Sequence, residues 1–184
     1  MPELQDMLVE EMQDLLHAEQ QLVKALPKMA KAAHQPQLQR AFQKHLEETQ
    51  GHVERLERAF EILGTKPKPK VCKGMQGLIA EGQEKITEGK KKDKIIADLE
   101  LAGAAQKVEH YEISGYGTTR TLAEKLGRDK LAKLLSETLA EEEKTDKLLT
   151  QLCAPLLDER SQESESGGKE KEATRVVHRT AGTK

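Results

Sequence analysis

The stretch that decides the fold is Leu15-Leu16-His17-Ala18-Glu19-Gln20-Gln21-Leu22. It lies inside residues 2–33, where apolar residues recur three and four positions apart on one helix face. At about 100° per residue, Glu19 falls near the centre of that apolar face. A lone carboxylate on a buried face costs on the order of several kcal/mol unless it is paired or bound. The sequence therefore predicts that Glu19 meets partners inside the fold.

The composition of the chain predicts an all-α protein. Its 184 residues suit one domain, aromatic residues make up 2%, and there is no tryptophan. Leucine, alanine, glutamate and lysine dominate, and alternating β-branched runs are absent. The net charge of −2 argues against a strong general attraction to nucleic acid or to anionic lipid.

The two cysteines, Cys72 and Cys153, do not form a CxxC pair, which is typical of reduced thiols in a cytoplasmic protein. The first residues do not resemble a signal peptide. No apolar run is long enough to span a bilayer, so no membrane partner is expected.

The apolar pattern predicts four long helices, with a kink or break at Pro27 in the first. A polar linker and a short helix separate the second from the third, and Pro67 and Pro69 keep the linker extended. The pattern ends near residue 157, so residues 1–157 are expected to form the bundle and residues 158–184 a disordered polar tail. The predicted helices span residues 2–33, 37–63, 75–88, 94–126 and 129–157.

Each of the other three long helices also places polar residues on or beside its apolar face. They are Glu112 in residues 94–126, Glu142 and Asp146 in residues 129–157, and His45, Glu48 and His52 in residues 37–63. Acids and imidazoles thus recur where a bundle would be buried.

A faint internal repeat relates the two halves of the chain. A shift of 93 residues superimposes Glu19 on Glu112 and Glu48 on Glu141, together with several leucines. Each half therefore reads as a helical hairpin, and the rise of about 1.5 Å per residue brings the acids of each hairpin level within roughly one turn. Packing the two hairpins together would gather these groups in one layer.

Four carboxylates in one apolar layer cannot all be ionised and unpaired. No lysine or arginine lies at the centre of the four apolar faces near this level, so internal pairing is poorly supplied. Carboxylates together with imidazole suit iron or manganese. A glutamate from each of two helices and a glutamate–histidine pair from each of the others is the recurring di-iron design of helical bundles.

Several segments resemble the YciE/YciF family of ferritin-like stress proteins, a domain family without an established activity. The resemblance covers about residues 1–157, and Glu109-His110-Tyr111-Glu112 is its most specific part. It implies a ferritin-like four-helix bundle of two antiparallel hairpins joined by a long crossover. The other matching segments are His45-Leu46-Glu47-Glu48-Thr49, residues 105–113, Tyr116-Gly117 and residues 139–146.

The chain departs from the Glu-x-x-His motif of ferritin-like proteins. Gly51 lies three positions after Glu48, and His52 lies four after it. On the last helix, Glu142 is followed by a threonine at the third position and by Asp146 at the fourth. Either spacing keeps both side chains on one helix face, so the second ligand of each pair is left open.

Two further pairs of residues compete. His45 competes with His52 as the imidazole ligand. Glu141 is favoured by the repeat and Glu142 by the apolar face, because burial of the large apolar side chains fixes how the helix is rotated. The sequence therefore predicts that Glu142 is the ligand and that Glu141 is exposed or contacts a ligand. Glu109 lies at the edge of its face and is expected to be solvated.

The sequence and the resemblance together predict a stress-associated protein with a carboxylate-bridged pair of metal ions, iron first and manganese as the alternative. Such a centre would oxidise ferrous iron or reduce peroxide, with an unknown electron donor or small oxidant; whether the chain is an enzyme is left open. The rival readings are a metal-free helical interaction protein and a subunit of an iron-storage cage. A homo-oligomer is expected, with a dimer favoured. The predicted metal residues are Glu19, Glu48, His52, Glu112, Glu142 and Asp146, of which Glu19 and Glu112 are terminal ligands and Glu48 and Glu142 bridging ones.

Overall fold

The computed structural model describes the backbone of residues 2–68 and 70–180 and the side chains of residues 2–68 and 70–162. The described residues form five helices and no strand. The all-α prediction is confirmed, and α1 runs without interruption through Pro27. The helices are α1 (Pro2–Ala32), α2 (Pro36–Leu63), α3 (Lys73–Gly89), α4 (Lys94–Lys125) and α5 (Asp129–Thr180).

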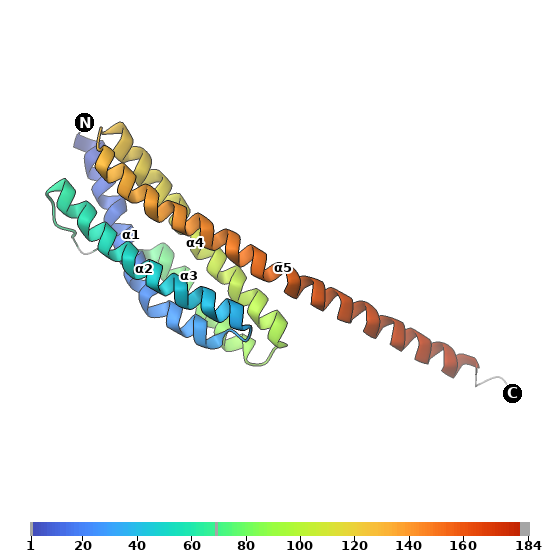
Figure 1. The fold of residues 1–184 in the computed structure, drawn as a ribbon. Helices are drawn as coiled ribbons and strands as arrows, with labels where there is room; N and C mark the ends of the chain where they lie inside the picture. Colours follow the sequence, from blue (N-terminus) through green and yellow to red (C-terminus); the bar gives the residue numbers. More distant parts are fainter. Residues whose placement is uncertain (1, 69, 181–184) are drawn as a thin grey trace.

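Helices α1, α2, α4 and α5 form the bundle, and α3 covers one side of it. α1 pairs with α2 and α4 pairs with α5 as two hairpins, while α2 also contacts α5 and α1 also contacts α4 (Figure 1). The short helix α3 lies in the crossover between the hairpins and packs against α1 and α4. The predicted bundle of two hairpins joined by a long crossover is confirmed.

The turns between helices are fixed by a few residues. Gly64 and Gly127 follow α2 and α4 with φ of 66°, a left-handed conformation that glycine adopts without steric cost. The carboxylate of Asp98 on α4 accepts hydrogen bonds from the backbone N–H groups of His34 (2.8 Å) and Gln35 (2.7 Å) in the turn between α1 and α2. Asp98 therefore ties one hairpin to the other at this end of the bundle.

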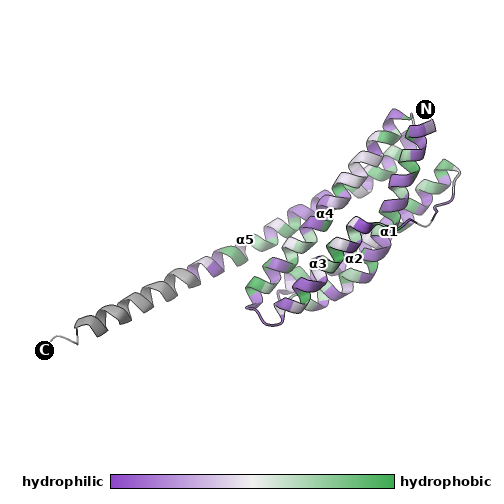
Figure 2. Ribbon diagram, turned by 180° about the vertical axis from the view of Figure 1, so that it is seen from behind, coloured by the Kyte–Doolittle hydropathy of each residue, from purple (hydrophilic) through white to green (hydrophobic). Residues whose placement is uncertain are grey.

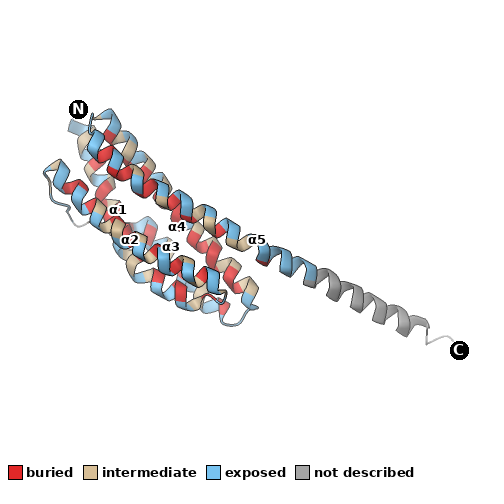
Figure 3. Ribbon diagram, viewed as in Figure 1, coloured by how far each residue is buried: buried red, intermediate tan, exposed pale blue. Residues whose placement is uncertain are grey.

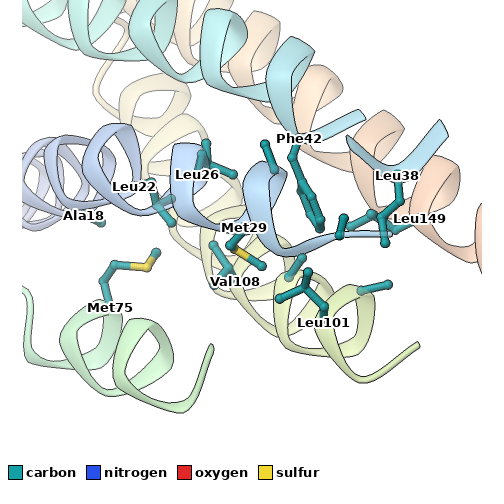
Figure 4. Packing of buried hydrophobic residues seen from close by; sticks show 14 of the residues in the cluster. Ala18, Leu22, Leu26, Met29, Leu38, Phe42, Met75, Leu101, Val108 and Leu149 are labelled. Atoms are coloured by element: carbon teal, nitrogen blue, oxygen red, sulfur yellow. The ribbon is translucent and has the colours of Figure 1, made fainter. Parts of the chain in front are cut away.

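The apolar core consists of two clusters, which divide along α1 between Leu16 and Ala18. The buried Glu19 follows directly after the division, so a polar layer lies near the boundary between the clusters. Figure 3 marks the buried residues along the helices of the bundle, and Figure 4 shows the packing of the first cluster. Burial of each large side chain contributes about 1.5–3 kcal/mol and holds the helices in register. The first cluster includes Leu22, Leu26, Phe42, Leu101 and Leu149, and the second includes Leu8, Met12, Leu56, Phe60 and Leu131.

Hydrophilic and hydrophobic residues interleave along the helices of the bundle (Figure 2). This patterning matches helices that bury one face and expose the other. Within the described part of the chain, no helix is both long enough and apolar enough to cross a membrane.

The C-terminal segment differs from the sequence prediction. The sequence predicts a disordered tail over residues 158–184, but α5 continues to Thr180 and projects beyond the bundle (Figure 1); residues 181–184 lie outside the described residues. Leu156 is buried, whereas residues 157–162 are exposed. The physical reason is that glutamate and lysine have high helix propensity. An apolar pattern in the sequence reports packing against the bundle, and its absence does not forbid helix geometry.

Candidate metal centre

Six titratable side chains are buried in the polar layer. None of them is more than 3% exposed. They come from all four helices of the bundle: Glu19 from α1, His45 and His52 from α2, Glu109 and Glu112 from α4, and Glu142 from α5.

Helical spacing brings these residues into one layer. His45 and His52 are seven residues apart and therefore lie on the same face of α2. Glu109 and Glu112 are three residues apart and are neighbours on α4. The adjacent apolar side chains rotate each helix so that these faces point inward, which buries the polar groups against one another.

His52 stands between the buried carboxylates and the surface. Its Nδ1 lies 3.0 Å from Glu142 Oε1 and 3.3 Å from Glu19 Oε1. Its Nε2 lies 2.9 Å from Oε2 of Glu141, a side chain that is 35% exposed. Nδ1 thus faces the centre and Nε2 faces outward.

His45 is placed the other way round. Its Nε2 lies 3.3 Å from Glu109 Oε1 and 3.7 Å from Glu142 Oε2, on the inner side. Its Nδ1 lies 3.3 Å from Thr145 Oγ1 and 3.7 Å from Glu48 Oε2, on the outer side. The two imidazoles therefore present opposite ring nitrogens to the same carboxylate, Glu142.

Tyr116 is fully buried beside Glu19 and donates a hydrogen bond of 2.5 Å from its hydroxyl to Glu19 Oε1. The ring of Tyr116 also lies edge-on to His52, with ring centroids 6.4 Å apart. Tyr116 therefore holds one oxygen of Glu19 and leaves the other free for another partner.

The layer contains many polar atoms without a hydrogen-bond partner, although buried polar groups are normally satisfied. Glu112 is the extreme case, because neither of its oxygens has a hydrogen-bond partner and, unlike Glu142, it forms no ion pair with a described histidine. No described lysine or arginine forms an ion pair with any of the four buried glutamates. Unsatisfied carboxylate oxygens and imidazole nitrogens facing one another are the donor set of a metal centre, so these residues fit bound cations. The others without a partner are Glu19 Oε2, His45 Nε2, His52 Nδ1, Glu109 Oε2 and both oxygens of Glu142.

The two imidazoles respond to the surrounding negative charge. Burial alone lowers the pKa of His45, but attraction and hydrogen bonding from Glu109 raise it well above its ordinary value overall. Burial likewise opposes the charged form of His52, while Glu142 and Glu19 raise its pKa to about 10. Without metal, both histidines are therefore expected to be cationic at neutral pH.

Burial and mutual repulsion favour the neutral, protonated form of the buried acids. Burial, followed by repulsion from Glu19 and Glu142, raises the pKa of Glu112 well above its ordinary range. Burial raises the pKa of Glu142 to about 7, although His52 pulls it down. In the metal-free protein the layer therefore holds extra protons, which cations could replace.

The donor atoms divide into two groups that share one residue. In each group, the possible ligand atoms all lie within 4.8 Å of one another. The shared residue is Glu142, whose carboxylate has two oxygens, so one side chain could serve two neighbouring cations. The groups are His45, Glu109, Glu112 and Glu142, and Glu19, His52 and Glu142.

The structure brings together four of the six metal residues predicted from sequence: Glu19, His52, Glu112 and Glu142. The other two lie outside both groups. Glu48 is 21% exposed and pairs with Lys44 at 3.0 Å. Asp146 is 22% exposed, and its Oδ1 accepts a hydrogen bond of 3.1 Å from Gln106 and lies 3.3 Å from His110 Nε2.

The prediction that Glu109 is solvated is wrong, because this side chain is 2% exposed and belongs to the donor set. Its signal in the sequence is its position three residues before Glu112, on a neighbouring part of the same face. His45 joins His52 instead of competing with it, and their spacing of seven residues is the corresponding signal. Tyr116 lies four residues after Glu112 on the same helix face, which is a similar signal. The role of Arg55, described below, has no such local signal.

The comparisons with known proteins match most of the chain. A family model described as a domain of unknown function, DUF892, matches residues 3–162. Protein YciF of Escherichia coli (strain K12) is 46% identical over 154 residues, which are 83% of this chain and 92% of that protein. The crystal structure of the E. coli stress protein YciF matches with a TM-score of 0.81 at 44% identity, covering 84% of this chain and 97% of that one. YcfI from Rhodopseudomonas palustris matches with a TM-score of 0.76 at 41% identity, covering 80% and 92%.

Proposed function

The chain belongs to the DUF892 family, and on that premise we propose that it is a stress-associated protein that binds two metal ions in the buried polar layer. Iron is the metal we expect, with manganese as the alternative. The stress role is transferred from the E. coli relative, which is described as a stress protein.

The observation that carries the proposal is the pair of donor groups that share Glu142. One group supplies three carboxylates and one imidazole, and the other supplies two carboxylates and one imidazole. Two cations held in this way would be linked by the Glu142 carboxylate, as in carboxylate-bridged di-metal bundles. Glu19 and Glu112 would then be terminal ligands, as the sequence predicts, whereas Glu109 and His45 would take the places predicted for Glu48 and Asp146.

A carboxylate-bridged iron pair would supply one-electron chemistry toward oxygen or peroxide when bound. The chain contributes the surroundings of that pair. The two apolar clusters exclude bulk water from the layer, which strengthens every electrostatic interaction within it. The hydroxyl of Tyr116 orients Glu19, and the carboxylate of Glu141 receives the outer N–H of His52.

A metal-free interaction protein is the second candidate, and one observation favours it. Both imidazoles lie within 3.0–3.7 Å of buried carboxylates, so protonated histidines could neutralise part of the layer without any metal. In this interpretation no described cationic side chain pairs with Glu112, whose oxygens meet only the other buried carboxylates. The metal reading accounts for these atoms, and we therefore prefer it.

Metal analysis separates these two candidates. Protein purified without chelator and loaded anaerobically with ferrous iron is expected to hold two ions per chain. The double variant Glu19→Ala plus Glu112→Ala removes one terminal acid from each group, so we expect it to lose most of this iron. Exposed acids such as Glu54 and Glu143 provide the matched control, because a Glu54→Ala plus Glu143→Ala variant has the same change in charge. Equal iron in the double variant and in this control would reject the site.

A further inference from the structure

We propose that Arg55 and Glu141 form a clamp on the outer side of His52, which fixes the ring nitrogen that faces the metal centre. The clamp makes Nδ1 of His52 the donor atom. Arg55 and Glu141 are thereby positioning residues and not ligands. This inference rests on the proposed metal-binding function and assigns a role to two side chains that lie outside both donor groups.

The clamp consists of short contacts that cross from α2 to α5. Glu141 Oε2 lies 2.9 Å from Nε2 of His52. Arg55 binds the same carboxylate with two prongs, from Nη1 to Oε2 at 2.9 Å and from Nη2 to Oε1 at 3.3 Å. Nη1 of Arg55 also donates to Thr138 Oγ1 at 2.6 Å. Thr138 and Glu141 thus fix the planar guanidinium, which in turn holds Glu141 against the imidazole.

The chemistry of imidazole explains why the outer contact matters at the inner atom. A metal-binding imidazole carries its single proton on the nitrogen that is not bound to metal. A carboxylate at Nε2 keeps that proton on Nε2 and so leaves the lone pair on Nδ1. Nδ1 is the nitrogen that faces Glu19 and Glu142. Carboxylates placed in this way commonly orient metal-binding histidines and raise their basicity.

Arg55 is needed because Glu141 is partly exposed. The Glu141 side chain is 35% exposed and Arg55 is 19% exposed, whereas His52 is fully buried. Without the guanidinium, the Glu141 carboxylate would be free to turn into solvent. Arg55 therefore keeps Glu141 on the imidazole and offsets its charge at the mouth of the buried layer.

The outer side of His45 is held less firmly. Its Nδ1 lies 3.3 Å from the neutral Thr145 hydroxyl and 3.7 Å from Glu48, longer than the 2.9 Å contact of His52. Glu48 in turn pairs with Lys44 through a single atom contact. Loss of the clamp should therefore weaken the ion held by His52 and leave the ion held by His45 almost unchanged.

The test uses the full chain and two probes, Co²⁺ for affinity and Zn²⁺ for the ring nitrogens. Calorimetric titration with Co²⁺ measures how many ions bind and how tightly. Long-range ¹H–¹⁵N spectra of the zinc-loaded protein show which nitrogen of His52 carries the proton. The variants are Glu141→Leu, which removes the acceptor, and Glu141→Gln, which keeps a neutral acceptor. Glu137→Leu is the matched control. Glu137 is also on α5 and is 50% exposed, and its ion-pair contact with Arg55 Nε is long, at 3.8 Å.

Glu141→Leu is expected to weaken one of the two Co²⁺ ions by about 10–100-fold and to leave the other unchanged. In the zinc-loaded form of Glu141→Leu, the proton of His52 should no longer be confined to Nε2. Glu141→Gln should retain that state with an intermediate affinity, which a merely structural role would not produce. Glu137→Leu should match the wild type in both measurements.

Two results would overturn the clamp. One is wild-type affinity for both ions in Glu141→Leu with His52 still protonated on Nε2. The other is an equal loss of affinity in Glu137→Leu, which would assign the effect to the charge of α5. If the wild-type protein binds no Co²⁺, the proposed function fails and the clamp fails with it; normal wild-type binding with unaffected Glu141 variants rejects the clamp alone.

Discussion

Replacing Glu142 with alanine should abolish binding of both metal ions, whereas replacing Glu141 should leave both sites able to fill. Glu142 is fully buried and is the one residue common to both donor groups. Its removal takes a carboxylate from each group at once and leaves His52 without its nearest inner partner. Glu141 contacts only the outer nitrogen of that imidazole, so its loss weakens one ion without removing a ligand.

The measurement is iron per chain after anaerobic loading, together with the rate of ferrous iron oxidation at saturating iron. We expect Glu142→Ala to show neither bound iron nor oxidation, and Glu141→Ala to keep most of both. The adjacent positions on α5 and the identical change in side chain make each variant the control for the other, and circular dichroism checks that both are folded. The opposite ranking would contradict the assignment of Glu142 as the shared ligand.

The metal-free protein should lose stability steeply as the pH rises from about 5 to about 9. The pKa of Glu142 is raised from 4.5 to about 7, so its stabilising proton is fully held below pH 4.5 and is lost as the pH rises to about 7. The pKa of Glu112 is raised in the same direction. The pKa of His52 is raised from 6.5 to about 10, so the stability it contributes is present below pH 6.5 and is lost as the pH approaches 10. All these shifts have the same sign.

Each proton that the folded state holds in excess lowers the free energy of unfolding by about 1.4 kcal/mol per pH unit of increase. Bound cations replace these protons, so the melting temperatures of the metal-free and metal-loaded forms should diverge as the pH rises. The outer acids Glu48 and Glu141 have lowered pKa values and act in the opposite sense, but only below about pH 4.5. They therefore leave the interval above pH 5 unaffected.

Thermal unfolding of both forms at several pH values tests this expectation. The control is Glu112→Gln, which keeps the shape of a buried side chain and removes one of the titrating groups. Its metal-free form should show a shallower decline than the wild type. A metal-free melting temperature that stays level or rises between about pH 5 and about pH 8 would contradict a buried, proton-holding layer.

The bundle could be predicted because its local signals agree with its packing. The apolar face around Glu19 identified α1, and the glycine after α2 marked the end of that helix. The extension of α5 was not predicted, because an apolar pattern reports packing and not the helix propensity of a polar segment. Helix boundaries in the bundle therefore followed from sequence, while the end of α5 did not.

The competing choices on α5 have a simple structural explanation. The apolar face placed Glu142 inside, where the structure has it, and the repeat paired Glu141 with Glu48. Both of these paired acids are outer partners of an imidazole, Glu141 with His52 and Glu48 with His45. The repeat thus relates the outer acids of the two hairpins, whereas the apolar face identifies the inner one.

The remaining differences come from tertiary packing. Glu109 lies about 60° round the helix from Glu112, so a narrow apolar face leaves it at the edge. In the structure α4 packs against α1, α3 and α5, which buries a wider arc and brings Glu109 inside. Arg55 on α2 contacts Glu141 on α5, 86 residues away in sequence. No periodicity within one helix can predict such a contact.

Anomalous diffraction at the iron edge, from crystals loaded anaerobically with ferrous iron, tests the central claim most directly. We predict two peaks per chain in the buried layer, one bounded by His45, Glu109 and Glu112 and the other by Glu19 and His52, with Glu142 between them. A layer without iron, or iron bound only to exposed acids at the surface, would contradict the account.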